Sequence, residues 1–403
     1  MSRKLVQINT VFYASTGKIM GEIQKYAEQE GYETISFAGR PPVTNGMRSE
    51  MFGNPVSFWS HVALTTVFDA QGYGSYFSTK KLIKRLREEQ PDIIHLHNLH
   101  GYYLNIPLLC KYLTEEFQGK IFWTFHDCWP VTGHCAHFAS INCSKWETGC
   151  YQCKKKKEYP ISLFWDGAKR NYEMKKKLFV KIPNLTVIVP SEWMKQNIER
   201  SFLADKKIEV VSNGIDLNTF TPMQDDTVWN KYNIPTDKKI VLGVSNVWSK
   251  SKGLNTFLGL RKALSPDYCI VLVGLSKRQI RMMPEGVAGI ERTENKEELV
   301  KIYSNADVFV NPSVEESFSL VTVEAMACGT PVVVLNTSAV KELVCDECGI
   351  VLDKYTTQDY VNAIQMIENK KLEKYQIRAC AQKYSVDNMV SNIINLYDKS
   401  MEG

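Results

Sequence analysis

Two carboxylates near an expected helix start form the strongest candidate site for chemistry. Glu316 and Glu324 lie in the segment NPSVEESFSLVTVEAMACGTPVVV, where a strand is predicted to end at Asn311 and a helix to begin near Ser319. Free amides at a helix start bind anions, so the backbone of Phe318–Leu320 could hold a phosphate group. Glu316 follows the carboxyl end of a parallel strand, where open α/β sheets bind ligands, and Glu324 lies far enough along the helix to reach a ribose. The simpler alternative is that both carboxylates only stabilise the first half of the helix.

A group of cysteines in a stretch without periodicity is the second candidate site. Cys135, Cys143, Cys150 and Cys153 fall within 19 residues, and the last two have the Cys-x-x-Cys spacing of a zinc knuckle. Four thiolates would form a closed, tetrahedral and therefore structural Zn²⁺ site. The alternative is a set of buried apolar thiols, which a segment with so little periodic apolar sequence would not bury. Other residues that could serve as ligands are Cys128, His134 and His137.

The chain contains eleven cysteines in all. In a reducing compartment this number favours metal ligands or buried thiols over a disulfide framework. Cys345 and Cys348 also have the Cys-x-x-Cys spacing, but they lack partners nearby and are predicted to lie in an ordinary loop. Core positions are predicted for Cys269, Cys328 and Cys380, which lie in or near apolar segments.

Four histidines lie at the ends of expected strands. His126 directly follows the strand Lys120–Phe125 and is either a structural residue or part of an active site. His95, His97 and His100 could indicate a metal site, because His95 and His97 share one face of a strand. No carboxylate or cysteine nearby completes a ligand set. The sequence therefore favours a strand rim that lines an interdomain cleft.

The elements that position these residues alternate between strands and helices along the whole chain. Short apolar runs separated by stretches of helical periodicity are typical of βαβ units and parallel sheets. One series of strands is expected at Lys4–Thr10, Glu33–Ala38, Asp92–His97, Lys120–Phe125 and Leu185–Val189, and a second at Lys239–Val244, Cys269–Val273, Asp307–Asn311 and Pro331–Leu335. Two such series predict an α/β fold with two doubly wound domains.

Breaker residues between Asn213 and Asp237 place the domain boundary in that stretch. We assign residues 1–218 to an N-terminal domain, with a cysteine-rich insert at 128–160, and residues 219–385 to a C-terminal domain. The amphipathic segment 386–403 is expected to form a last helix that could pack back on the N-terminal domain. An insert of this length without periodicity is usually functional or held by a metal.

Composition and motifs exclude several classes of protein. With 403 residues, 44% hydrophobic and 23% charged, the chain is close to the globular average, which excludes disorder and coiled coil. No apolar run approaches the ~20 residues of a membrane-spanning helix, and the N-terminus lacks a cleavable signal, so we expect a cytoplasmic protein. A net charge of +5 is too small to indicate nucleic acid. No Gly-x-Gly-x-x-Gly follows a strand, and Ser15–Lys18 lacks the first glycine and the Mg²⁺-binding hydroxyl of a P-loop.

The Glu-x7-Glu pattern followed by AMACGTPVV resembles retaining glycosyltransferase family 4, whose members have the GT-B fold of two Rossmann-like domains facing a cleft. Further similarities appear in order along the chain: a loop with Gly17 after the first strand, His126, Asn213–Gly214 and Lys252–Gly253. The resemblance covers essentially the whole chain outside the insert. The segment HDCWPVTGHC, which begins at His126, more narrowly resembles bacterial exopolysaccharide transferases of the colanic-acid type.

The resemblance implies a nucleoside-diphosphate sugar donor bound mainly by the C-terminal domain and a glycan acceptor bound mainly by the N-terminal one. Glu324 would bind the ribose hydroxyls, Glu316 the donor sugar, and Lys252 the diphosphate together with the amides of Phe318–Leu320. No cofactor would be needed for catalysis. Serines replace the family's usual glycines on both sides of Phe318, which narrows the room for the sugar, and Ser319 is expected to cap the helix.

Two further roles are implied for the N-terminal domain. Gly17 would let the backbone approach the substrates closely, and His126 would face the reacting carbon. The arginine that usually precedes the diphosphate lysine is absent. Lys250, Arg278 or Arg281 could take its place, although a lysine lacks the bidentate fork of an arginine.

The sequence therefore predicts a glycosyltransferase that moves a hexose-type unit, with retention, to a lipid-linked glycan for a surface or exopolysaccharide. Basic clusters at Lys80–Arg87, Lys154–Lys157 and Lys175–Lys177 could hold the acceptor domain against anionic lipid on the inner face of the membrane. One alternative is a GT-B sugar-nucleotide 2-epimerase, which would work without an acceptor. The other is a non-catalytic interaction module held by zinc, against which the intact Glu-x7-Glu segment argues.

Overall fold

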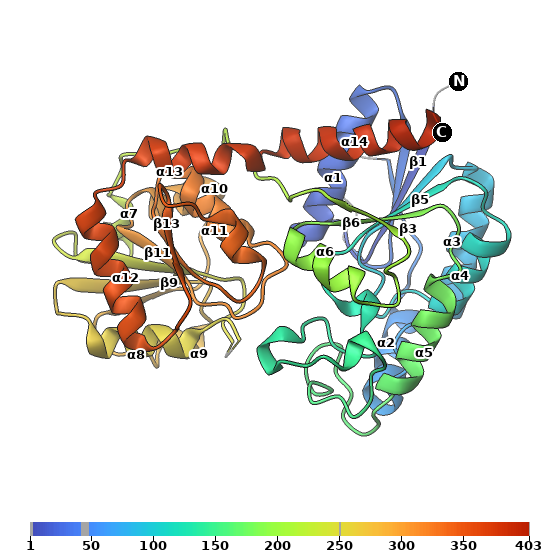
Figure 1. Ribbon diagram of the computed structural model, residues 1–403, viewed down its shortest axis with the longest axis horizontal. Coiled ribbons are helices and arrows are strands. Elements are labelled where there is room, and N and C mark those ends of the chain that lie inside the picture. Colours follow the sequence, from blue (N-terminus) through green and yellow to red (C-terminus); the bar gives the residue numbers. More distant parts are fainter. Residues whose placement is uncertain (1–2, 42–47, 250, 403) are drawn as a thin grey trace. The chain divides into compact units, whose positions relative to one another are not determined.

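The computed structural model describes residues 3–41, 48–249 and 251–402. The chain divides into two compact units, the first formed by Met1–Ser212 with Met389–Gly403 and the second by Asn213–Asn388. Each unit contains a parallel sheet with helices around it (Figure 1). The predicted α/β fold of two Rossmann-like domains is confirmed. Among the described residues, no helix is both long and apolar enough to cross a bilayer.

The sheet of the first unit has, within the described residues, seven parallel strands in the order β3-β2-β1-β4-β5-β6-β7. The strands are β1 (Lys4–Asn9), β2 (Glu33–Ala38), β3 (Ser49–Met51), β4 (Ile93–Leu96), β5 (Lys120–Thr124), β6 (Leu185–Val189) and β7 (Lys207–Val210). The helices are α1 (Ala14–Gln29), α2 (Pro55–Phe68), α3 (Tyr76–Glu89), α4 (Ile106–Glu115), α5 (Ala168–Phe179) and α6 (Glu192–Glu199). The strand order reverses between β1 and β4, and sheets of this kind bind ligands beyond the carboxyl ends of the strands at that point.

The sheet of the second unit repeats this pattern with six described strands in the order β10-β9-β8-β11-β12-β13. The strands are β8 (Lys239–Val244), β9 (Tyr268–Val273), β10 (Val287–Ile290), β11 (Val308–Asn311), β12 (Val332–Leu335) and β13 (Gly349–Leu352). The helices are α7 (Val228–Lys231), α8 (Leu254–Ala263), α9 (Lys277–Ile280), α10 (Lys296–Ser304), α11 (Leu320–Ala327), α12 (Thr357–Lys370) and α13 (Lys374–Ala381). The side chains of β8 alternate between two cores, Leu242 in one and Val241 in the other, which is why the strand is an unbroken apolar run. Here the order reverses between β8 and β11.

The last helix, α14 (Val386–Glu402), packs with its C-terminal half on the first unit. The Tyr397 ring meets the rings of Tyr32 and Phe122 at centroid distances of 6.2 and 4.8 Å. Asp398 accepts hydrogen bonds from Tyr32, at 2.7 Å, and from Arg3. The two ends of the chain therefore complete one unit together.

The insert contains no long helix or strand, as predicted. Its described backbone forms only short 3-10 turns, at Trp129–Val131, Ala139–Ile141 and Lys145–Glu147. Aromatic side chains supply its packing: the rings of Phe138 and Trp146 stack at 4.6 Å. Because regular hydrogen bonding is scarce here, the insert depends on side-chain contacts for its shape.

Candidate functional site

Lys252 and Glu316 meet where the strand order of the second sheet reverses. Lys252 lies in the loop after β8 and Glu316 in the loop after β11, and these two strands are paired neighbours. The Lys252 Nζ donates a hydrogen bond to Glu316 Oε1 at 2.7 Å. Both side chains are partly exposed. The topology of the sheet thus brings together two residues that are far apart in the sequence, at the place where such sheets bind ligands.

A glycine allows these two loops to lie in contact. Gly253, at the start of α8, has a φ of 76°, a left-handed conformation that favours glycine. A Cβ at this position would lie 2.4 Å from Pro312 Cγ, in the loop that leads to Glu316. The backbone of Glu316 is fixed in turn, because its N–H donates to Ser338 Oγ at 3.0 Å. Gly253 and Ser338 therefore position the Lys252–Glu316 pair.

Ser319 directly precedes α11 but does not cap the helix as predicted. Its φ of 106° lies in the left-handed region, and its side chain bonds no first-turn amide. Instead, Ser319 Oγ accepts from Asn311 Nδ2 at 2.9 Å and lies 2.9 Å from Thr322 Oγ1. The predicted cap is wrong because this backbone conformation directs the side chain toward β11. Next to it, Phe318 is buried against Tyr384, whereas Leu320 is partly exposed.

Glu324 lies within α11 and is partly buried. Its Oε2 accepts a hydrogen bond from the hydroxyl of Tyr303 at 3.0 Å. Burial, and then the charge of Glu324, raises the pKa of Tyr303 well above its usual value, so Tyr303 remains a donor. Tyr303 comes from α10, and nothing in the sequence around Glu324 indicates this partner. It fixes the direction of the carboxylate.

The predicted replacements for the missing arginine stay predictions. Lys250 lies outside the described residues. Arg278, in α9, and Arg281, just after it, have exposed side chains. Both follow β9, the strand next to β8.

Gly17 lies in the first turn of α1 rather than in the loop before it. A Cβ at this position would lie 2.4 Å from the carbonyl carbon of Phe12 and 2.8 Å from its oxygen. The absence of a side chain therefore lets the loop after β1 fold against the start of the helix. Close approach to a substrate at Gly17 remains a prediction.

His126 belongs to a row of hydrogen-bonded side chains in the first unit. Its Nε2 lies 3.2 Å from His97 Nδ1, and His97 Nε2 lies 3.1 Å from Gln7 Oε1. Because an amide oxygen only accepts, His97 donates from Nε2 and accepts at Nδ1 from the Nε2–H of His126. Burial lowers the pKa of His126 to about 4. At neutral pH His126 is therefore a neutral imidazole with its proton on Nε2.

Asp127 is the charged neighbour of this row. It accepts hydrogen bonds from His100 Nε2 at 2.7 Å and from the Trp129 N–H at 2.8 Å. Burial alone would raise the pKa of Asp127, but His100 and the Trp129 amide lower it to about 2. Asp127 is thus a carboxylate throughout the physiological range.

The prediction that His95 and His97 line a cleft is wrong. The two side chains are 0% and 1% exposed, and their rings lie 4.3 Å apart. His95 is bonded on both sides, to Tyr397 Oη at 2.5 Å and to Thr124 Oγ1 at 2.7 Å. Helix α14, which supplies Tyr397, covers this part of the sheet. Both histidines are structural residues of the first unit.

The four cysteines predicted as metal ligands line one pocket of the insert, of about 190 Å³. They are Cys135, Cys143, Cys150 and Cys153, and His134 also lines it. The hydrogen bond with Cys135 lowers the pKa of Cys153 to about 7, whereas burial raises that of Cys150 to about 11. Metal binding by this group stays a prediction.

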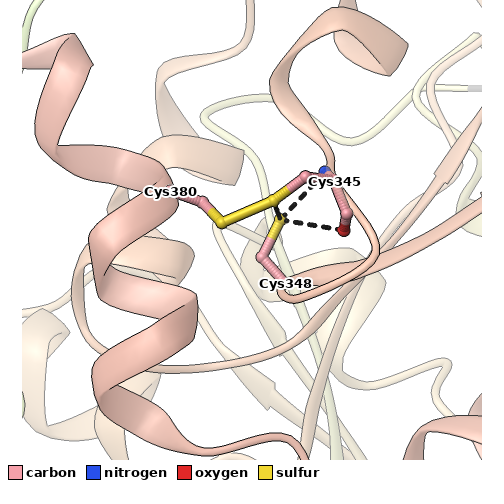
Figure 2. A group of neighbouring side chains, drawn as sticks. All are labelled: Cys345, Cys348 and Cys380. Carbon is pink, nitrogen blue, oxygen red and sulfur yellow. Dashed lines mark hydrogen bonds between the residues drawn. A yellow bond between two sulfur atoms is a disulfide. The ribbon is translucent and has the colours of Figure 1, made fainter.

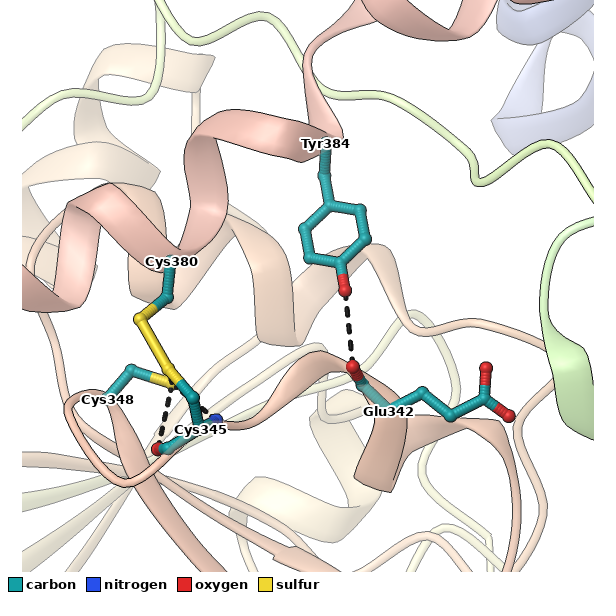
Figure 3. The surroundings of a disulfide bond; sticks show 5 residues. All are labelled: Glu342, Cys345, Cys348, Cys380 and Tyr384. Carbon is teal, nitrogen blue, oxygen red and sulfur yellow. Dashed lines mark hydrogen bonds between the residues drawn. A yellow bond between two sulfur atoms is a disulfide. The ribbon is translucent and has the colours of Figure 1, made fainter.

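Three other cysteines lie close together in the second unit, although Cys345 and Cys348 were predicted to lack partners. A disulfide joins Cys345 to Cys380, and Cys348 Sγ lies 3.3 Å from Cys345 Sγ (Figure 2). These three sulfur atoms all lie within 4.8 Å of one another, a spacing at which they could hold a metal ion. Cys380 comes from α13, which also carries the chain toward Tyr384, whereas Cys345 and Cys348 precede β13 (Figure 3). This grouping could not be predicted from the sequence, because 35 residues separate the bonded pair.

Comparison with known proteins places this chain in a family. Residues 18–219, half of the chain, match the family described as Glycosyltransferase Family 4, and residues 225–383 match Glycosyl transferases group 1. The chain therefore belongs to glycosyltransferase family 4 and is a glycosyltransferase of the GT-B type. This confirms the resemblance found in the sequence. It favours a glycosyltransferase over a sugar-nucleotide 2-epimerase or a non-catalytic interaction module.

Individual relatives agree with this assignment. The Escherichia coli protein named as colanic acid biosynthesis glycosyl transferase WcaC is 24% identical over 353 residues, which cover 84% of this chain and 83% of that protein. The structure of sucrose-phosphate synthase from Thermosynechococcus elongatus has a TM-score of 0.75 at 18% identity, over 99% of both chains. That of Anabaena HepE in complex with UDP and glucose has a TM-score of 0.69 at 16% identity, over 98% of this chain and 99% of the other. At such identities these structures establish the fold.

Proposed function

We propose that this glycosyltransferase transfers a hexose, with retention of configuration, from a nucleoside-diphosphate sugar to a lipid-linked glycan. The observation that carries the donor half of the proposal is the Lys252–Glu316 pair at the reversal point of the second sheet. The start of α11 follows Glu316 directly, and Glu324 lies on that helix. The complex of HepE with UDP and glucose supports a nucleotide sugar as the ligand of such a fold.

Each residue of the donor site has one task in this proposal. Lys252 leaves its ion pair to neutralise the diphosphate, and the first amides of α11 bind the phosphate oxygens. Glu316 then contacts the donor sugar, while Glu324, held by Tyr303, accepts hydrogen bonds from the ribose hydroxyls. No metal ion is required, because a lysine and a helix start supply the stabilisation of the leaving group.

In the reaction, the bond between the anomeric carbon and the diphosphate oxygen breaks, and the acceptor oxygen bonds to the same face of that carbon. The acceptor proton passes to the departing phosphate oxygen, so a separate base is unnecessary. The products are the glycoside and the nucleoside diphosphate. A neutral His126 suits this scheme, since it can bind a sugar hydroxyl without adding charge beside the reacting carbon.

Thermal-shift measurements with UDP-, GDP- and ADP-sugars, with and without EDTA, test the donor site first. One nucleotide series should raise the melting temperature in the presence of EDTA. Glu316→Gln should keep this shift but lower transfer by at least a hundredfold. Glu368→Gln, which removes a similar lysine partner (Lys239, 2.8 Å) at the amino end of the second sheet, should transfer normally. Near-normal transfer by Glu316→Gln would remove Glu316 from the active site.

A membrane-bound acceptor is supported by an apolar face on the first unit. Residues 55–68, which form α2, include no Asp, Glu, Lys or Arg, and the helix buries its polar His61 and Thr65. Its apolar side chains are exposed instead, with Val56 at 80% and Trp59 at 66%. A helix with polar residues inward and apolar residues outward is the reverse of an ordinary surface helix.

The segment 161–165 extends this face. The N–H of Trp165 donates to the carbonyl of Val67 at 3.2 Å, so the segment runs beside the end of α2. Phe164 and Trp165 are 73% and 62% exposed. We call Val56, Trp59, Phe68, Phe164 and Trp165 the apolar surface. A set of exposed aromatic side chains of this kind fits the interfacial region of a bilayer.

Basic side chains border the apolar surface, which favours an anionic membrane as its partner. Lys156 Nζ donates to the carbonyl of Phe164 at 3.5 Å, and Arg170 donates to that of Phe68 at 2.9 Å. Two lysines of the predicted basic clusters are not available to a membrane. Lys175 is fully buried, and Lys155 is buried beside Glu158.

Co-sedimentation with phosphatidylcholine vesicles, with and without phosphatidylserine, tests this acceptor proposal. Burial of one large apolar side chain contributes about 1.5–3 kcal/mol, so Trp59→Ser with Phe164→Ser should weaken binding at least tenfold. Tyr375→Ser, which removes a 70% exposed ring in the second unit, should bind like the wild type. Absence of binding by the wild type, or equal binding by the double variant, would overturn the membrane contact without affecting the donor site.

A further inference from the structure

The pocket of the insert brings together five side chains of the types that bind metal ions. Four cysteines and His134 line it, although the surrounding backbone has only 3-10 turns to hold it in place. The four thiols face a common space, and those of Cys135 and Cys153 share a hydrogen bond.

His134 provides an independent observation. Its side chain is completely buried, and Nδ1 lies 2.8 Å from Asp69 Oδ1, an oxygen that only accepts, so Nδ1 carries a proton. Gln71 fixes this carboxylate at 2.8 Å and is itself fixed by the indole N–H of Trp129 at 2.7 Å. The other ring nitrogen, Nε2, is buried without a hydrogen-bond partner. Buried polar atoms are nearly always hydrogen-bonded, so this nitrogen points to a missing partner in the pocket.

Lys175 places a buried amino group near two of these cysteines. It is 0% exposed, and its Nζ donates to the carbonyls of Trp129 and Thr132 at 2.7 and 3.0 Å. Within the described residues, no carboxylate oxygen lies within 4.0 Å of it. Burial lowers the pKa of Lys175 to about 7. The groups that raise this pKa are two thiols and two carboxylates, those of Cys150, Cys135, Asp127 and Asp69. Thiolates in the pocket would add negative charge that favours the ammonium form.

We infer that this pocket binds one zinc ion through the thiolates of Cys135, Cys143, Cys150 and Cys153. Four thiolates suit zinc in tetrahedral geometry, and such a site is structural because no position remains open. His134, held by Asp69 and protonated on both ring nitrogens in the loaded site, donates its Nε2–H to a thiolate sulfur, and Lys175 offsets part of the negative charge of the cluster. The pocket of about 190 Å³ is wider than a tetrathiolate cluster, so binding draws the turns of the insert together and contributes to its folding.

The test is the metal content of the full chain after gel filtration, together with X-ray absorption at the zinc edge. We expect one zinc per chain and four sulfur ligands at about 2.3 Å. Cys150→Ser should lose most of the metal, whereas Cys348→Ser, in the other group of three cysteines, should keep it. A wild-type protein without zinc would overturn the proposal. So would a nitrogen ligand at about 2.0–2.1 Å, or the same zinc loss in Cys348→Ser.

Two further measurements guard against a Cys150→Ser variant that fails to fold. Cobalt bound to the wild-type chain should show thiolate charge-transfer absorption, and its absence would count against the site. His134→Gln should keep one zinc per chain but bind it about 10–100-fold more weakly in competition with a chelator, because the positioning partner is lost. Unchanged zinc affinity in His134→Gln would remove His134 from the site.

Discussion

The two carboxylates of the proposed donor site are held by different kinds of partner. Glu316 is paired with Lys252, a cation that a bound diphosphate can attract away. Glu324 is paired with the neutral hydroxyl of Tyr303, which orients the carboxylate and leaves its charge in place. In the proposed function, this difference suits Glu316 to a site whose charge changes when the donor binds, and Glu324 to binding of the nucleotide.

Replacement of Glu324 and of its partner should therefore affect nucleotide binding. Glu324→Ala should weaken nucleotide binding at least tenfold, since hydrogen bonds to a charged group contribute about 1.5–3 kcal/mol. Tyr303→Phe should weaken it by a smaller factor with little change in kcat, because an interaction made equally in ground and transition states acts through KM. Isothermal titration with the nucleotide and steady-state kinetics measure both effects.

The matched control is Tyr268→Phe. Tyr268 donates to Glu368 at 2.6 Å, a similar pair that lies at the start of β9 and so at the opposite end of the sheet. This variant should bind nucleotide like the wild type. If Tyr268→Phe and Tyr303→Phe weaken binding equally, the effect comes from stability and not from the orientation of Glu324.

The sequence predicted a pair of residues in the proposed donor site only where each residue of the pair lies in a recognisable motif. Lys252 and Glu316 each follow a strand, and the parallel order of the sheet then brings them together. Tyr303 and Cys380 could not be predicted, because each reaches its partner from a helix whose own sequence indicates only core packing. His134 was proposed as a substitute ligand, but its partner Asp69 lies 65 residues away.

At the scale of elements, the strands absent from the prediction are the edges of the two sheets. They are β3, β7, β10 and β13, and each is only three or four residues long. An edge strand is covered less completely than a central one, and here β3 and β7 have no continuous apolar run, while those of β10 and β13 are only four residues long. The central strands, which carry the site at their carboxyl ends, are buried on both faces and were predicted from sequence alone.

The start of α11 combines a strained backbone with a compensating hydrogen bond. A non-glycine residue with the φ of 106° at Ser319 costs about 1–3 kcal/mol, and the bond from Asn311 returns about 0.5–1.5 kcal/mol. Ser319→Ala removes the bond and keeps the strain, whereas Ser319→Gly removes both. We therefore expect the glycine variant to be more stable than the alanine variant by about 1–2 kcal/mol, as measured by urea unfolding. Equal stabilities would show that the backbone at this position is relaxed.

At the scale of the whole molecule, titratable histidines are distributed unevenly. All seven histidines of the chain lie between His61 and His137, and residues 213–388 contain none. Burial lowers the pKa of His61 to about 4 and that of His95 to about 3. His61 Nε2 accepts a hydrogen bond from the N–H of Gly72 at 3.2 Å, which requires the neutral ring. The pKa of His134 shifts in the other direction. Burial lowers this pKa, but the hydrogen bond to Asp69 and the charge of that carboxylate oppose burial, and the pKa is raised above its usual value.

Acid should therefore unfold the first unit before the second. An unfolded histidine takes up a proton below about pH 6.5, whereas native His61 and His95 do so only near pH 4 and 3. Their contribution to the free energy of unfolding is complete above pH 6.5 and falls by about 1.4 kcal/mol per pH unit for each histidine below it. At pH 5 the two together contribute about 4 kcal/mol less than at pH 7, and His134 offsets part of this loss.

Hydrogen exchange at pH 7 and pH 5, corrected for intrinsic rates, separates the two units. Amides of β1, β4 and β5 should lose protection, while those of β8, β9 and β11 keep it. Release of zinc from the proposed site would also weaken the first unit in acid. The slope of the free energy of unfolding against pH therefore distinguishes the two causes better than the loss of protection does. His61→Gln removes one titrating group and should make that slope shallower by about 1.4 kcal/mol per pH unit between pH 6.5 and 4. An unchanged slope in this variant would assign the acid sensitivity to the insert and not to buried neutral histidines.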